Sequence, residues 1–300
     1  MGKSRGKCHN QKLNNMRKKK EIFEAFNSVH DFYETISGRN ANAQFAARFG
    51  ETWKESAASS AGTLEFTGTE SYDEAETLAK EGYAKGAANL AKVDASNFAG
   101  QTQKRRAVKA DVVGFAPIVP NLLIGVPNAM LNSTLQPRKI PVVSLYYQIS
   151  ASYKVKAKDL ESAARKVLAA VNAIERKNIR VELNVCECAE TSHSKGQPIT
   201  CIVKLKEYRQ PLDLLKIAYP LTHPSFFRRH LFRWKETMPD LDESFKDVTS
   251  NYGQAIKDEK RAFENNLKGH VPENSVFLSF YQAQYLTAQQ IAELISSRQH

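Results

Sequence analysis

The chain has 300 residues, 42% of them apolar, which is enough to form the core of two medium domains or of one large domain with extensions. The formal net charge is +11, and eight cations without any acid lie in residues 1–20, the basic leader, so the charge of the body is nearly balanced. The leader lacks an apolar stretch and three prolines break the longest apolar run, so we expect neither a secretory signal nor a membrane span.

Cysteine usage indicates the compartment. The four cysteines are too few for a disulfide framework in a chain of this length. Because reduced cysteines are typical of reducing compartments, we expect a cytoplasmic protein.

The first predicted elements after the leader are helical. Apolar residues recur at helical spacing over residues 22–36, and the pattern stops at the next glycine. The sequence SYDE (residues 71–74) is a capping box, which predicts a helix that ends at Gly82. A shorter helix is expected over residues 85–93. Residues 21–139 are therefore predicted to form a helical region.

Two unusual segments close this region. Residues 101–109 are basic and polar, and GFAPIVPNLLIGVPNAML (residues 114–131) carries three prolines that neither a helix nor a central strand accommodates. We expect residues 114–131 to form an ordered, partly buried loop that covers apolar surface.

From residue 142 the sequence pattern changes to apolar, strand-like runs that alternate with a helical pattern. Residues 142–149 are apolar, as in a strand that is buried on both faces of a parallel sheet. Residues 160–174 show the apolar face of a helix, and residues 179–188 supply the next strand. This βαβ-like unit is expected to be right-handed. Residues 198–207 are predicted to return as an antiparallel hairpin.

The remaining predicted elements are two helices, a strand and a capped terminal helix. They cover residues 223–236, 245–269, 275–281 and 287–298. Residues 140–300 are therefore predicted to form a Rossmann-like three-layer α/β domain with a mostly parallel sheet, preceded by a helical region and a disordered basic leader.

The segment QISAS (residues 148–152) resembles the D-x-S-x-S motif of von Willebrand factor A domains, in which an aspartate and two serines hold a divalent cation. Ser150 and Ser152 match the two serines, but Gln148 stands at the position of the aspartate. A neutral amide does not supply the charge that a hard cation requires. The resemblance therefore implies a degenerate von Willebrand factor A-like domain without a metal ion.

A second resemblance covers most of the chain beyond residue 60. The motifs GTESYDEAETLAKEGY, GFAPIVPNLLIGVPNAML and HPSFFRRHLFRWKE, together with the QISAS segment, are similar to a family of phage-encoded proteins of unknown function. This resemblance implies no catalytic residues, and it implies the cytoplasm of a bacterial host as the setting.

Several polar groups allow a functional and a structural interpretation. Ser150 and Ser152 are expected to cap the following helix, with a bound cation or a serine nucleophile as alternatives. With Gln148 they form the strand-end crevice, the edge where open α/β sheets bind ligands. The thiols of Cys186, Cys188 and Cys201 would form a metal site with His193 if they converged, but burial as small apolar residues is the favoured interpretation.

The histidines and arginines of residues 223–236 are also open to two interpretations. His223 and His230 are two helical turns apart, which favours structural roles over a shared metal ion. The arginines of this segment form either a phosphate-binding face or a solvated side of the helix.

The basic leader is the strongest functional feature, because clustered cations release counterions when they meet a polyphosphate. A solubilising tail is the alternative. The predicted nucleic-acid-binding residues are Lys3, Arg5, Lys7, Lys12, Arg17, Lys18, Lys19, Lys20, Lys104, Arg105, Arg106, Lys109, Arg228, Arg229 and Arg233.

The sequence thus predicts a non-catalytic, nucleic-acid-associated binding or adaptor protein that recruits a protein partner through its α/β domain. We expect no cofactor, no metal ion and no membrane partner. The alternative is a structural or assembly protein that binds only other proteins. A hydrolase that uses Ser150 or Ser152 with His193 or His223 is disfavoured, because no nucleophile turn surrounds the serines.

Overall fold

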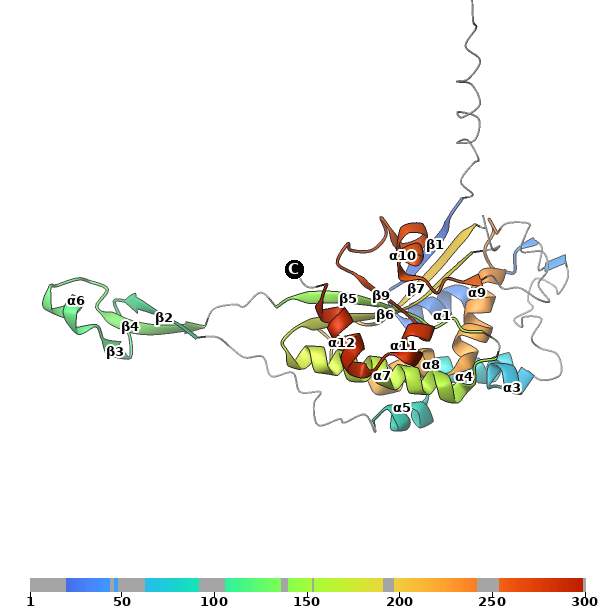
Figure 1. The fold of residues 1–300 in the computed structure, drawn as a ribbon, viewed down its shortest axis with the longest axis horizontal. Helices are drawn as coiled ribbons and strands as arrows, with labels where there is room; N and C mark the ends of the chain where they lie inside the picture. Colours follow the sequence, from blue (N-terminus) through green and yellow to red (C-terminus); the bar gives the residue numbers. More distant parts are fainter. Residues whose placement is uncertain are drawn as a thin grey trace, which may run out of the picture.

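The computed structural model describes residues 20–43, 46–47, 63–91, 106–135, 140–152, 154–190, 197–241 and 254–298. Its centre is a mixed, mostly parallel sheet with the strand order β1-β7-β6-β5-β9, and the short strand β8 pairs with β6 (Figure 1). The strands are β1 (Ile22–Phe26), β5 (Val142–Gln148), β6 (Arg180–Glu190), β7 (Pro198–Lys206), β8 (Gln254–Ala255) and β9 (Val276–Ser279).

The predicted βαβ-like unit and hairpin are confirmed. Strand β5 leads into α7 (Ala157–Arg176), whose apolar face is buried, and β6 then pairs with β5 in parallel. Strand β7 returns antiparallel to β6, with Cys186 opposite Ile202. Strand β9 adds in parallel to the other side of β5. The apolar composition of β5 is explained by its central position, since a strand with neighbours on both sides and helices on both faces has little contact with water.

The predicted helix over residues 22–36 is wrong in its first half. Residues 22–26 form β1, which pairs in parallel with β7, and only α1 (Val29–Ser37) is helical. The break falls at Ser28, whose side chain accepts a hydrogen bond from the Asp31 amide at 3.0 Å and caps α1. The sheet therefore extends beyond residues 140–300 and includes a strand next to the leader.

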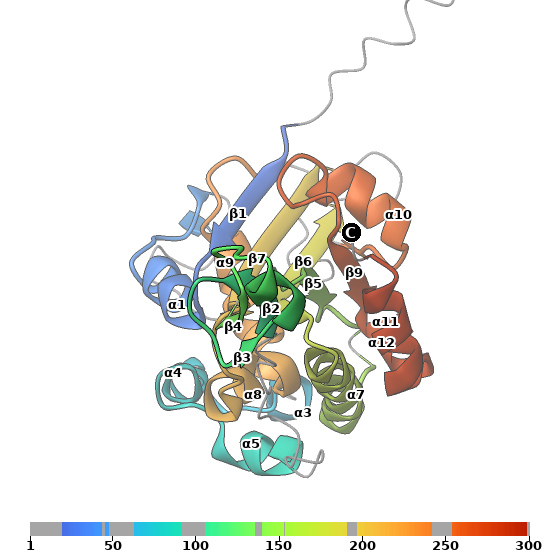
Figure 2. The ribbon, with the colours of Figure 1, turned by 90° about the vertical axis from the view of Figure 1, so that its left-hand side faces the viewer.

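Helices cover both faces of the sheet (Figure 2). On one face, α7 packs against α8 (Leu214–Thr222), α11 (Phe280–Tyr285) and α12 (Ala288–Ser296), and these helices enclose the larger core. On the other face, α10 (Glu259–Ala262) and the π-helix η5 (Phe263–Leu267) cover a smaller core. The coarse prediction of a three-layer α/β arrangement agrees with this structure.

The remaining helices lie beside the larger core. The predicted capping residue Ser71 accepts from the Glu74 amide at 3.1 Å, and α4 ends at Gly82 as expected. Helix α8 was not predicted, and residues 223–236 form a π-helix followed by an α-helix. These elements are α3 (Thr63–Thr67), α4 (Tyr72–Glu81), α5 (Ala84–Ala91), η3 (Phe226–Leu231) and α9 (Phe232–Glu236).

The C-terminal predictions are partly confirmed. Strand β9 and helix α12 occupy the expected places, but Phe280 and Tyr281 belong to α11 and not to the strand. The predicted helix over residues 245–269 is interrupted, because the described part consists of β8, α10 and η5. Ile256 lies between β8 and α10, where its backbone amide donates to the Cys188 carbonyl.

The prediction that residues 114–131 form a loop covering apolar surface is also wrong. Residues 106–135 form a separate antiparallel sheet, the arm, that projects away from the main sheet (Figure 1). The large apolar side chains of the arm are mostly exposed, so they do not cover a core. The arm consists of β2 (Arg106–Asp111), β3 (Ala116–Pro117), α6 (Val119–Leu123) and β4 (Met130–Leu135). None of the helices in the described ranges is both long and apolar enough to cross a bilayer.

Candidate functional site

Two of the three residues of the strand-end crevice, Gln148 and Ser150, are buried, whereas Ser152 is exposed. The Gln148 side chain is buried and accepts a hydrogen bond from the Cys188 amide at 3.3 Å, which fixes it on β6. The Ser150 hydroxyl is buried and has no hydrogen-bond partner among the described residues. Helix α7 begins after Lys156 without a side-chain cap, so the prediction that the serines cap this helix is wrong.

An arginine from η3 lies at this edge of the sheet. The Arg228 guanidinium donates to the carbonyls of Ser152 and Val155, each at 3.0 Å, and also to the Phe66 carbonyl. It also lies over the rings of Phe66 and Phe227, at 4.5 and 4.8 Å from their centroids. Burial lowers the pKa of Arg228 to about 10, so the side chain remains charged at neutral pH. A fixed cation of the protein itself thus binds the loop that follows β5.

The prediction that Arg228, Arg229 and Arg233 bind nucleic acid is wrong, because all three side chains are buried. The Arg229 guanidinium donates to the hydroxyl and the carbonyl of Thr69, at 2.7 and 3.0 Å. The Arg233 guanidinium donates to the Arg39 carbonyl at 2.8 Å. With the Phe66 carbonyl bound by Arg228, two of the carbonyl acceptors belong to residues 63–69 and one follows α1, so the arginines hold these segments against η3 and α9.

The two histidines have structural partners, as predicted. His230 is buried, with Nδ1 3.2 Å from the Tyr72 hydroxyl and Nε2 3.2 Å from the Ala75 carbonyl. Nδ1 of His223 lies 2.7 Å from the Ser225 hydroxyl. Burial lowers the pKa of each imidazole to about 4, so both are neutral near pH 7.

These histidines should make stability depend on pH. Each has a pKa of about 4 in the folded state and about 6.5 when unfolded, so their full stability is present above pH 6.5. As the pH falls from 6.5 toward 4, the unfolded chain gains protons that the folded chain does not, and we expect a loss of about 2 kcal/mol per histidine at pH 5. Urea unfolding at pH 7 and pH 5 measures the loss, and a His230→Gln variant should show about half of it. Equal stability at both values in the native chain would contradict the assignment.

The cysteines of the sheet do not converge. Cys186 and Cys188 face the smaller core, whereas Cys201 pairs opposite Glu187 and faces the larger core. Desolvation by burial raises the pKa of the Cys186 and Cys201 thiols well above their usual range, so they remain protonated. The interpretation as small buried residues is confirmed for these cysteines, whereas His193 lies outside the described residues. No group of three metal-ligating side chains occurs within the described ranges.

Most of the other predicted nucleic-acid-binding residues lie outside the described ranges. This applies to Lys3, Arg5, Lys7, Lys12, Arg17, Lys18, Lys19, Lys104 and Arg105. Of the rest, Lys20 forms an ion pair with Asp240, Lys109 pairs with Asp111 at 3.3 Å, and Arg106 begins β2. The structure therefore does not bring these cations together into one described surface.

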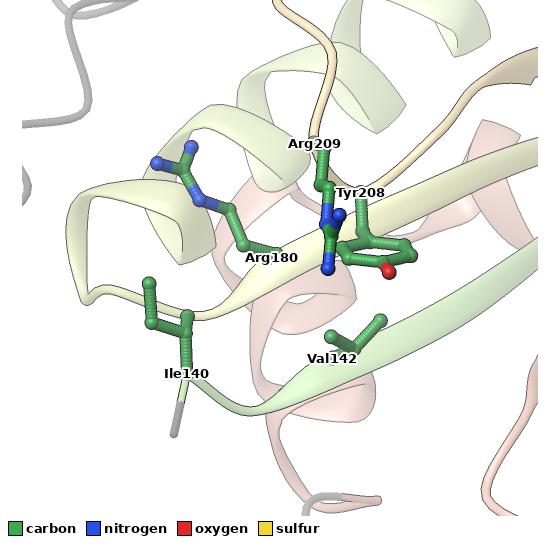
Figure 3. A pocket seen from close by; sticks show the side chains of 5 residues that line it. All are labelled: Ile140, Val142, Arg180, Tyr208 and Arg209. Carbon is green, nitrogen blue, oxygen red and sulfur yellow. The ribbon is translucent and has the colours of Figure 1, made fainter. Parts of the chain in front are cut away.

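A cavity that was not predicted lies at the opposite edge of the sheet. It has a volume of about 350 Å³ and is lined by Ile140, Val142, Arg180, Tyr208 and Arg209. Val142 and Arg180 begin the parallel strands β5 and β6, and Tyr208 and Arg209 follow the end of β7 (Figure 3). The antiparallel register of β6 and β7, with Leu183 opposite Lys206, brings these segments together.

The cavity is basic and contains an aromatic ring. The Arg209 guanidinium lies 5.3 Å from the centroid of the Tyr208 ring. Neither Arg180 nor Arg209 forms an ion pair within the described part of the chain, because the nearby carboxylates of Glu182 and Glu207 pair with Lys204 at 3.7 and 3.6 Å. The exposed Arg176 and Lys177 precede Arg180 in the sequence and add positive charge. This short basic run was the sequence signal that could have pointed to the cavity.

The fold and these two sites define a mixed α/β protein with a mostly parallel sheet. An arginine lies at the carboxyl end of β5, and a basic cavity lies at its amino end. Residues 7–294 match the family described as a domain of unknown function (DUF7192), and the chain belongs to this family. Neither a curated protein nor a solved structure matches the chain.

Proposed function

We propose that the protein is a non-catalytic, nucleic-acid-associated binding protein whose contact surface is the basic cavity. The observation that carries this proposal is a partly exposed tyrosine ring beside Arg209 in a cavity that Arg180 also lines, with no ion-pair partner for either arginine among the described residues. Guanidinium groups bind phosphates, and an aromatic ring stacks on an unpaired base irrespective of its identity. The combination favours single-stranded DNA or RNA, bound with little sequence preference.

The basic leader supplies the second contact. It precedes β1, which runs parallel to β7 and therefore starts at the sheet edge opposite the cavity. Twenty extended residues reach about 70 Å, whereas the eleven residues of β6 span about 36 Å. The leader is thus long enough to follow a polyanion that lies along the whole sheet.

Charge reversal at the cavity tests this proposal. We expect an Arg180→Glu/Arg209→Glu variant to bind a fluorescent single-stranded oligonucleotide more weakly and with a smaller salt dependence. Each lost phosphate contact should lower the slope of log K against log salt by about 0.7. Tyr208→Ala should weaken binding about 5- to 150-fold, the equivalent of about 1–3 kcal/mol per stacked base. Fluorescence anisotropy across a salt series measures both effects.

The matched control is Lys216→Glu/Lys260→Glu, which makes the same change in net charge at two exposed lysines on α8 and α10. This control should reduce binding less than the cavity variant and leave the effect of Tyr208→Ala unchanged. Removal of residues 1–20 should weaken binding further in both backgrounds. Equal effects of the two charge reversals, or no binding by the intact chain at low salt, would contradict the proposal.

The α/β sheet would act as the adaptor part of the molecule. In this proposal it is a degenerate von Willebrand factor A-like domain, phage-encoded and active in the host cytoplasm, that recruits a protein partner without a metal ion. Support comes from the mostly parallel sheet, from Gln148 at the position of the acidic ligand, and from Arg228 beside the serine loop. The Ser150 hydroxyl has no histidine partner in the described structure, and the proposal assigns it no catalytic role.

The second candidate function is that of a structural or assembly protein, and the exposed apolar arm favours it. Size-exclusion chromatography with a host lysate, in the presence of nuclease, separates the two candidates. A complex that survives nuclease treatment and forms equally well with the cavity variant would favour the assembly role.

A further inference from the structure

The arm concentrates exposed apolar side chains in one part of the molecule. Residues 112–137 contain no charged residue, and the side chains near the turn are well exposed, with Phe115 at 66%, Leu123 at 78% and Ile124 at 74%. The other large exposed apolar residues of the arm are Val108, Val112, Val113, Val119, Leu122 and Val126. A monomeric protein in water rarely exposes such a contiguous group unless the surface binds something.

Much of the backbone of the arm tip forms hydrogen bonds within the arm. The amides of Phe115 and Ile118 donate to the carbonyls of Leu131 and Ala129, at 2.8 and 2.7 Å. The amides of residues 122, 124, 125 and 126 also donate within the tip, and the three prolines have no amide hydrogen to satisfy. A backbone of this kind enters an apolar environment at low cost, since few of its amide groups lose hydrogen bonds to water.

The tip has a fixed shape. A Cβ atom on Gly114 would lie 2.1 Å from the Leu131 carbonyl oxygen, so the connection between β2 and β3 lies directly against the backbone of β4 there. Gly125 has a φ of 74°, which allows the tight turn that follows α6. The exposed apolar side chains are therefore presented by an ordered element with its own hydrogen bonds.

The sequence is basic at both ends of the arm. Arg106 and Lys109 lie on β2, and Lys104, Arg105, Arg138 and Lys139 flank the arm in the sequence. Asp111 is the sole acid of residues 104–139, and it is engaged by Lys109, by the Val112 amide and by the Asn132 side chain. The backbone hydrogen bond from Val112 is the main cause that lowers the pKa of Asp111. The arm thus combines an uncharged apolar tip with a sequence that is rich in cations where the arm begins and ends.

We infer that the arm is a membrane-contacting element that inserts its tip into the interface of an anionic lipid surface. Apolar side chains at the tip would enter the boundary between headgroups and acyl chains, while the cations at the base meet the anionic headgroups. This contact needs no membrane-spanning segment. It replaces the sequence-based expectation that no membrane takes part, and it goes beyond the proposed binding of nucleic acid.

A second copy of the chain fits the arm less well. Outside the arm, the large apolar side chains exposed by the described residues are Leu64, Leu215 and Tyr285. They belong to α3, α8 and α11, and they do not form a matching apolar surface for the tip. The charge pattern also differs from that of a self-complementary contact, because the cations at the base of the arm would face those of the other copy.

A tryptophan reporter tests the inference directly. We expect Phe115→Trp to show a shift of its fluorescence to shorter wavelength, and quenching by brominated lipid, when vesicles of phosphatidylcholine and phosphatidylglycerol are added to the nuclease-treated protein. The matched control is Tyr285→Trp, which places the reporter at a residue of the body that is 82% exposed. This control should show neither change. Insertion should persist from about 0.1 M to about 1 M salt, whereas a contact made only by the basic leader is screened.

A substitution in the tip provides the second test. Leu123→Ser/Ile124→Ser should reduce partitioning into these vesicles on the order of tenfold or more, because two exposed apolar side chains are lost. Its far-ultraviolet circular dichroism and its oligonucleotide binding should match those of the native chain, which separates this test from that of the proposed function. An unchanged Phe115→Trp spectrum, equal shifts in both reporters, or tip-dependent dimerisation without vesicle binding in sedimentation would each overturn the inference.

Discussion

Replacing Lys235 with methionine should lower the free energy of unfolding by about 3–5 kcal/mol. Lys235 is 1% exposed, and its ammonium group donates to a carboxylate oxygen of Glu187, which is 5% exposed. The other Glu187 oxygen is buried without a hydrogen-bond partner among the described residues. The variant would leave a buried carboxylate without its counter-charge, which costs far more than the ion pair itself contributes. Urea unfolding followed by circular dichroism measures the change.

A double variant separates loss of the ion pair from loss of packing. Lys235→Met/Glu187→Gln removes both charges and should recover most of the lost stability, because a buried pair replaced as a unit is often close to neutral. Glu187→Gln alone should also be destabilising, since it removes the charge of the carboxylate to which the Lys235 ammonium group donates. A single Lys235→Met variant within about 1 kcal/mol of the native chain would show that the two side chains do not form a buried ion pair in solution.

Replacing Arg228 with methionine should destabilise the protein by about 4 kcal/mol or more. The substitution removes charged hydrogen bonds to the carbonyls of Phe66, Ser152 and Val155, each of which contributes about 1.5–3 kcal/mol. It also removes the cation that lies over the rings of Phe66 and Phe227. Chemical unfolding measures the loss of stability.

Two further variants make this result specific. Arg228→Lys keeps the charge but cannot reach three carbonyls with the same geometry, so its stability should lie between the native chain and Arg228→Met. Arg209→Met removes an exposed arginine and should change stability by no more than about 0.5 kcal/mol. If Arg228→Met is as stable as Arg209→Met, Arg228 does not hold the loop after β5 in solution.

The sequence predicted the centre of the fold well because its signals are local. An apolar run, an amphipathic helix and a second apolar run were sufficient to predict β5, α7 and β6. Strand β1 was missed because five residues carry little periodicity and their partner lies in β7, far along the chain. The capping residue Ser28 was the one local sign that a helix begins later.

The candidate sites were harder to predict because they depend on contacts between distant segments. The arginines of η3 and α9 were expected at a surface, since charged side chains are usually solvated. They are buried because residues 63–69 and the chain after α1 supply carbonyl acceptors, a pairing that no local pattern indicates. The cavity requires the register of β6 and β7. The arm was misjudged because apolar composition indicates burial in general and does not identify a separate projecting sheet.

The pairing of Ile22 with Ile199 means that β1 cannot join the sheet until β7 has been synthesised. The first strand leaves the ribosome on the order of ten seconds or more before its neighbour in the sheet has been synthesised. Throughout that interval the cationic segment that precedes it is accessible on the nascent polypeptide. Polyanions in the surroundings therefore have the opportunity to engage this segment before the edge of the sheet is closed.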